Sequence, residues 1–113
     1  MSKKFEVEWT ESAENDPLKI VEYIALESPG NALKILKKIK KQAQELYHSP
    51  ERCRMVPELH DQGIHQYREM IISPWRVVFR IANSKVFVVL VFDSRRDIED
   101  ILLKRLTDIN YLT

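Results

Sequence analysis

The sequence predicts one α+β domain over residues 1–113, with a small antiparallel β-sheet, a two-helix hairpin packed on it near the N-terminus, and a short C-terminal helix. Two observations predict this class. Apolar residues recur at helical spacing between residues 16 and 48, whereas residues 67–93 form short apolar runs separated by turn residues. A length of 113 residues is enough for one hydrophobic core.

The N-terminal part should form a strand followed by a helix. Phe5–Trp9 alternates apolar and charged residues, as a half-buried strand does. Thr10 is a residue type that caps helices, but Pro17 is tolerated best in the first helical turn. We therefore expect the helix to begin near Asp16 and to end before the turn-forming segment Ser28–Asn31.

The second helix is predicted from about Asn31 to His48. Its apolar residues share one face, and its lysines share the opposite face, which we interpret as solvated. Because the joining turn is short, the two helices should form an antiparallel hairpin over one side of the sheet. The apolar positions are Ala32, Ile35, Leu36, Ile39, Ala43 and Leu46, and the lysines are Lys34, Lys37, Lys38 and Lys41.

A long connection and three strands should follow. Residues 49–66 contain two prolines and no sustained period, and long loops of this kind are often functional. Strands are predicted at 67–73, 75–82 and 85–93, separated by tight turns. The run Val86–Phe92 is apolar at both parities, which favours a central strand covered on both faces. Asp97 is expected to cap the last helix.

Composition excludes several classes of protein. With a net charge of only +1, bulk attraction to nucleic acid or to a membrane is not expected. Cys53 is the single cysteine, so an internal disulfide and a multi-cysteine zinc site are excluded. We predict no metal and no cofactor. The apolar runs are too short to cross a bilayer and no secretion signal is evident, so we expect a cytoplasmic protein.

The arginines are the most informative feature. All eight lie after residue 50, and several interrupt apolar strands. Arginine keeps its charge at cellular pH, and its planar fork of donors suits phosphate or carboxylate. We predict that arginines from separate strands converge on one sheet face and bind an anionic partner, either RNA phosphates or an acidic protein segment. The candidate site residues are Arg68, Arg76, Arg95 and Arg96.

Ion pairing within the protein is the alternative interpretation of these arginines. Nearby carboxylates can neutralise them at the surface, where such pairs are common and contribute little stability. The available acids are Glu69, Asp93, Asp97 and Glu99.

Several motifs make the whole chain resemble the RelE/ParE superfamily of toxins from bacterial type II toxin–antitoxin systems. Ser49–Leu59 resembles the family loop P-x-x-G-R-x-V-P-E-L, with Cys53 where glycine is usual. The other matching segments are A-x-x-D at Ala13–Asp16, I-V-E-Y-I-A at Ile20–Ala25, Y-R-E at Tyr67–Glu69, P-W-R-V-V-F-R-I at Pro74–Ile81 and S-R-R-D at Ser94–Asp97.

The resemblance implies a toxin that arrests growth and is held inactive by a cognate antitoxin, in a complex of the two proteins. ParE-like members of the superfamily block DNA gyrase. RelE-like members cleave mRNA on the ribosome without a metal. By resemblance, Arg76 matches the strand arginine of the ribonucleases, Arg68 matches a basic position on the preceding strand, and Arg95 or Arg96 matches the arginine after the central strand.

The match to the ribonuclease branch is incomplete. Met70 stands where that branch has a second basic residue, and Ile101 and Leu102 stand where it has a tyrosine. The helical hairpin and the V-P-E-L loop favour the ParE side. Three residues remain as candidate proton-transfer groups for a ribonuclease: Tyr111, His65 and Asp93.

Three hypotheses follow from the sequence. The first is a non-catalytic inhibitor of gyrase or of another essential target. The second is a metal-independent, ribosome-dependent mRNA endoribonuclease. The third is a degenerate copy with no toxicity of its own.

Overall fold

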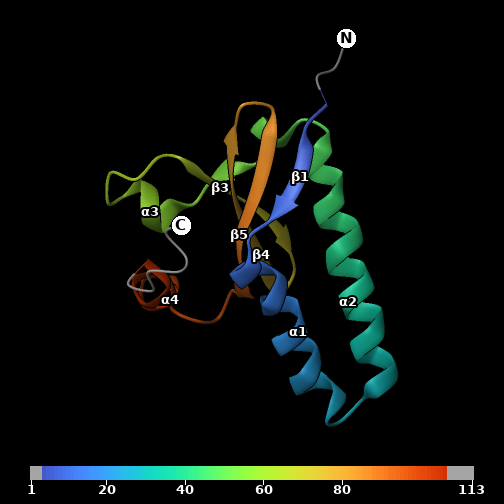
Figure 1. Cartoon of the computed structure of the whole chain (residues 1–113). Coiled ribbons are helices and arrows are strands. Elements are labelled where there is room, and N and C mark those ends of the chain that lie inside the picture. Colours follow the sequence, from blue (N-terminus) through green and yellow to red (C-terminus); the bar gives the residue numbers. More distant parts are fainter. Residues whose placement is uncertain (1–3, 107–113) are drawn as a thin grey trace.

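A five-stranded sheet forms the middle of the structure, with helices on both of its faces (Figure 1). The computed structural model describes residues 4–106, apart from the side chains at positions 103 and 106. The strands are ordered β1-β5-β4-β3-β2. The elements are β1 Glu6–Trp9, α1 Glu11–Ala25, α2 Pro29–Gln44, η1 Glu45–Tyr47, η2 Pro50–Arg52, β2 Arg54–Met55, α3 Pro57–His60, β3 Tyr67–Ile72, β4 Trp75–Ala82, β5 Lys85–Asp93 and α4 Ile98–Leu106.

The last three strands form the predicted antiparallel meander, within one residue of the predicted bounds. Asn83 and Ser84 join β4 to β5 with φ values of 50° and 67°, the backbone that a two-residue hairpin turn requires. β1 is the exception, because it pairs in parallel with β5. The predicted α+β class is confirmed, with one parallel pair in an otherwise antiparallel sheet.

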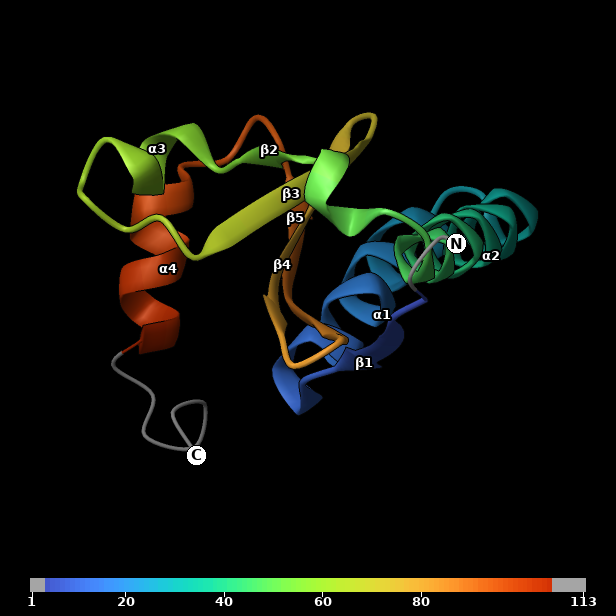
Figure 2. The same cartoon turned by 90° about the horizontal axis from the view of Figure 1, so that it is seen from above.

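The α1–α2 hairpin covers one face of the sheet, as Figure 2 shows from above. Side chains from both helices form one core there with residues of β3, β4 and β5, and we call this side of the sheet the hairpin face. Within residues 4–106, no helix is both long and apolar enough to span a membrane. The core of this face includes Ala13, Ile39, Leu46, Val77, Phe79, Val86 and Val88.

Helix α1 begins five residues earlier than the predicted start near Asp16, so that prediction is wrong. Thr10 is the N-cap, and its Oγ1 accepts a hydrogen bond from the Ala13 N–H at 3.2 Å. Pro17 therefore lies inside the helix, where it removes one backbone hydrogen bond. The Thr10 cap and the burial of Ala13 and Pro17 against the sheet outweigh that loss.

The opposite face of the sheet is covered by α4 and by the connection from residue 49 to residue 66. We call it the α4 face. As predicted, Asp97 caps α4, because its Oδ1 accepts a hydrogen bond from the Glu99 N–H at 2.9 Å. The connection contributes α3 and two buried apolar side chains to a second core. The buried residues of this core are Val56, Leu59, Val78, Val89, Leu90, Phe92, Ile98 and Leu102.

A β-bulge in β5 explains why its sequence is apolar at both parities. Val88 and Leu90 pair with consecutive residues of β4, which leaves Val89 as an extra residue. The bulge shifts the alternation, so Val88 and Val91 both face the hairpin whereas Leu90 faces α4. β5 is therefore buried on both faces, as predicted for a central strand.

Candidate functional site

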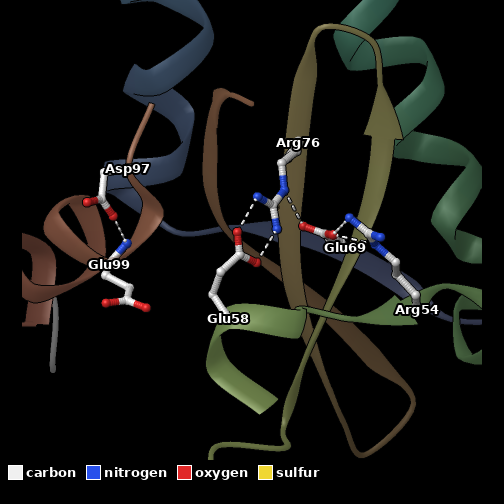
Figure 3. A network of polar contacts seen from close by, with 6 residues as sticks. All are labelled: Arg54, Glu58, Glu69, Arg76, Asp97 and Glu99. Carbon is white, nitrogen blue, oxygen red and sulfur yellow. Dashed lines mark hydrogen bonds and ion pairs between the residues drawn. The ribbon is translucent and has the colours of Figure 1, made fainter. Parts of the chain in front are cut away.

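Arg76 lies at the centre of a chain of four alternating charges on the α4 face (Figure 3). Its two terminal nitrogens donate to the two carboxylate oxygens of Glu58, each at 2.8 Å. Its Nε donates to Glu69 Oε1 at 2.6 Å, and Arg54 Nε donates to the other oxygen of Glu69 at 2.6 Å. The side chain of Arg76 is 7% exposed and that of Glu69 is fully buried. Two carboxylates of the protein itself therefore neutralise this guanidinium.

The network joins four elements that are separate in the sequence. Arg54 is on β2, Glu58 on α3, Glu69 on β3 and Arg76 on β4. The guanidinium carbon of Arg76 also lies 5.0 Å from the centroid of the Phe92 ring on β5, a cation–π contact. The network thereby fastens the connection between residues 49 and 66 to the sheet.

Arg76 holds the pKa of the Glu58 carboxyl below its ordinary value, mainly through the hydrogen bonds from the guanidinium. The same bonds raise the pKa of Arg76 further above its already high value. Both partners are consequently charged throughout the neutral range. The bidentate geometry is the strong form of arginine–carboxylate pairing.

The prediction that the arginines converge on one sheet face is wrong. Arg68 lies opposite Phe79, a residue of the hairpin face, whereas Arg76 lies opposite Ile71 and points to the α4 face. Side chains alternate across a strand, so this register places the two arginines on opposite sides of the sheet. Arg68 donates its Nη1 to the Cys53 carbonyl at 2.6 Å.

Arg95 and Arg96 follow β5 and lie apart from the Arg76 network. Arg95 donates its Nε and Nη2 to the Asp93 carboxylate at 2.9 and 2.6 Å. These bonds hold the pKa of Asp93 at about 2. Arg96 has no ion-pair partner among residues 4–106. The ion-pair interpretation is thus confirmed for Asp93 and Glu69, although the Arg76–Glu69 pair is buried rather than at the surface.

The candidate proton-transfer groups do not assemble around Arg76. The His65 ring packs against the His60 ring, with 4.5 Å between the ring centroids, and Asp93 is bound to Arg95. Tyr111 lies outside the described residues. In the part of the chain that the structure describes, no three His, Cys, Asp or Glu side chains are grouped to hold a metal ion.

Other cations gather along α1, the β5–α4 connection and α4. Two adjoining cavities of about 330 and 420 Å³ lie there over the end of β5, the smaller between α1 and α4 and the larger between α1 and the β5–α4 connection, and we call them together the α1–α4 groove. Lys19 and Arg96 line both cavities. Cations outnumber acids five to two along the groove, although the whole chain has a net charge of only +1. The charged lining residues are Lys19, Arg95, Arg96, Lys104, Arg105, Asp16 and Asp93.

An ion pair between α1 and α4 contributes to the lining of the groove. Arg105 Nη2 donates to Asp16 Oδ1 at 2.8 Å, and Arg105 Nη1 donates to Asp16 Oδ2 at 3.1 Å. The same two side chains also form hydrogen bonds with backbone groups at the edge of β5. Asp16 accepts from the Val91 N–H at 2.9 Å, and Arg105 donates to the Val89 carbonyl at 2.8 Å. β1 pairs with β5 only as far as Val88, so these side chains replace a neighbouring strand.

The sequence reasoning missed Asp16, Lys19 and Arg105. The sequence predicts Asp16 only as the start of the helix. Asp16 nevertheless shares one face of α1 with Ala13 and Ile20, and a carboxylate in an apolar stripe requires a partner. The helical spacing of Asp16 with these apolar residues could have indicated its buried ion pair. Nothing in the sequence marks Lys19 as a site residue, because an exposed lysine on a helix is ordinary.

Comparison with known proteins identifies the family. A family model described as "ParE toxin of type II toxin-antitoxin system, parDE" matches residues 7–98. The chain belongs to the ParE toxin family. The resemblance seen in the motifs is confirmed for the ParE branch. The match ends at Ile98, so most of α4, including Lys104 and Arg105 of the groove, lies beyond it.

A solved structure shares the fold of this ParE-family toxin. It is titled "Chromosomal ParDE TA system from P. aeruginosa" and aligns with a TM-score of 0.68 and 19% sequence identity. The alignment covers 81% of this chain and 98% of the other. No curated protein matches the sequence.

Replacing Arg76 with alanine should lower the free energy of unfolding of this toxin by about 3 kcal/mol or more, because a buried ion pair is broken. The matched control is Arg95→Ala, which removes an arginine whose side chain is 80% exposed and should change the unfolding midpoint little. Urea unfolding followed by tryptophan fluorescence measures both. Equal losses in the two variants would contradict a structural role for the Arg76 network.

The Arg76–Glu58 pair also predicts a pH dependence. Because the pKa of Glu58 in the folded protein is depressed, its contribution to stability is present above the ordinary value of 4.5 and is lost as the pH falls through the lower, folded-state value. Glu58→Gln should therefore flatten the loss of stability on the acid side. Glu22→Gln, an exposed position on α1, is the control and should keep the wild-type profile. An unchanged acid profile in Glu58→Gln would contradict the pairing.

Proposed function

We propose that this ParE-family toxin arrests bacterial growth by binding and inhibiting DNA gyrase, and that a cognate antitoxin neutralises it. The observation that carries the proposal is the neutralised Arg76. A guanidinium that two carboxylates already hold is not available to stabilise charge on a reacting phosphate. Inhibition by binding needs no such group.

The arrangement of the remaining candidates supports binding over RNA cleavage. Phosphoryl chemistry requires cations, a proton donor and a proton acceptor around one reacting atom. Arg68 and Arg76 lie on opposite faces of the sheet. Leu102, at a position where the resemblance to ribonucleases calls for a tyrosine, is buried in the second core. The mRNA endoribonuclease is therefore the weaker of the two hypotheses.

The partner proposal rests on the kind of system to which the family belongs. The family model describes the toxin of a parDE toxin–antitoxin pair, and the structurally similar protein is titled a ParDE system. We infer that this toxin acts in the cytoplasm and forms a hetero-oligomer with a protein antitoxin. Gyrase is then the target of the free toxin.

The purified toxin is expected to inhibit supercoiling of relaxed plasmid by gyrase, because a bound inhibitor blocks the enzyme cycle. Its induction should switch on a DNA-damage reporter while mRNA stays intact. The supercoiling assay is repeated with the antitoxin added, which should restore activity. Codon-linked mRNA cuts with normal supercoiling would instead favour the endoribonuclease, and absence of growth arrest would favour a degenerate copy.

A further inference from the structure

We propose that the α1–α4 groove binds an acidic segment of the antitoxin. In this complex, Lys19 from α1 and Arg96 from the β5–α4 connection pair with carboxylates, and apolar side chains of the segment pack against the apolar lining of the larger cavity. The inference rests on the proposed neutralisation by an antitoxin, and it identifies the surface where the two proteins meet.

The charges of the groove are arranged to receive an anion. Both acids that line it are already bonded, Asp16 to Arg105 and Asp93 to Arg95. Lys19 has no ion-pair partner among the described residues, and neither has Arg96. Because these two cations border both cavities, an incoming carboxylate meets them together.

The apolar part of the groove favours a protein segment over a nucleic acid. The two cavities, about 330 and 420 Å³, are within the size range of ligand pockets. Ile20, Ile24 and Trp75 line the larger one, and Tyr23 stands at its rim with 79% of its surface exposed. An exposed aromatic beside an apolar hollow is typical of protein interfaces. Binding to a phosphate backbone relies instead on an extended row of cations.

The backbone of β5 indicates how the segment docks. On the side of β5 away from β4, no described strand pairs with β5 beyond Val88, which leaves room for strand addition. Asp16 and Arg105 already occupy the hydrogen-bonding groups of Val91 and Val89, however. The segment therefore docks through its side chains rather than as an added strand.

The test is a charge reversal on the groove, Lys19→Glu with Arg96→Glu. The binding partner is the product of the reading frame beside the toxin gene, and the dissociation constant is measured by isothermal titration calorimetry at two salt concentrations. We expect the double variant to bind roughly 10- to 100-fold more weakly and with less dependence on salt. Tyr23→Ala should weaken binding as well.

The matched control is Lys34→Glu with Lys38→Glu, two exposed positions of α2 away from the groove that change the net charge equally. It should bind within about threefold of wild type, since general steering by charge is a small effect in salt. Because all four side chains are exposed, each double variant should keep the wild-type circular dichroism spectrum and melting temperature.

Each remaining outcome has a defined meaning. If wild type binds the partner and the groove variant binds equally well, or both double variants weaken alike, the groove proposal is overturned while the proposed function stands. If wild type does not bind the partner, both fail. If the groove variant keeps the partner but loses binding to a labelled 20-nucleotide single-stranded RNA, the groove is a nucleic-acid site and the proposal is overturned.

Discussion

The buried guanidinium of Arg76 is the interaction on which the C-terminal half of this toxin depends. Removing this guanidinium and the Glu69 carboxylate from water is unfavourable, and the bidentate contact with Glu58, the Arg76–Glu69 bond and the Arg54–Glu69 bond offset that cost. In doing so they fix where the connection from residue 49 to residue 66 meets the sheet. That position in turn brings Val56 and Leu59 into the second core.

A second ion pair, between Asp16 and Arg105, likewise joins separate elements, at the edge of β5 that faces away from β4. It joins the first helix to the last and supplies hydrogen bonds to a strand edge that β1 leaves uncovered. Together the two ion pairs determine which cations are available to bind another protein. Arg76 and Arg105 are held inside the fold, whereas Lys19 and Arg96 face solvent in the α1–α4 groove.

Local sequence pattern predicted much of this architecture. The spacing of apolar residues predicted the helical hairpin and the three-stranded meander, and the capping residue Asp97 predicted the start of α4. The error over the arginines was avoidable, because a turn at Ser73-Pro74 already sets β3 against β4 so that positions 68 and 76 fall on opposite faces. Glu69 and Asp93 were named as nearby acids, but the pairs of Arg76 with Glu58 and of Arg105 with Asp16 were not predictable, because Glu58 lies 18 residues from Arg76 and Asp16 lies 89 residues from Arg105. Pairs over such separations follow from the tertiary structure and not from spacing.

A double-mutant cycle on the free energy of unfolding tests most directly whether Arg76 is committed to the fold. The cycle compares wild type with Arg76→Met, Glu58→Gln and the double variant. A coupling energy of about 1.5 kcal/mol or more is expected for a charged, bidentate pair within one network. A coupling energy near zero would mean that Glu58 does not bind the two terminal nitrogens of Arg76 in solution and that these are available to an external anion, which would contradict the account.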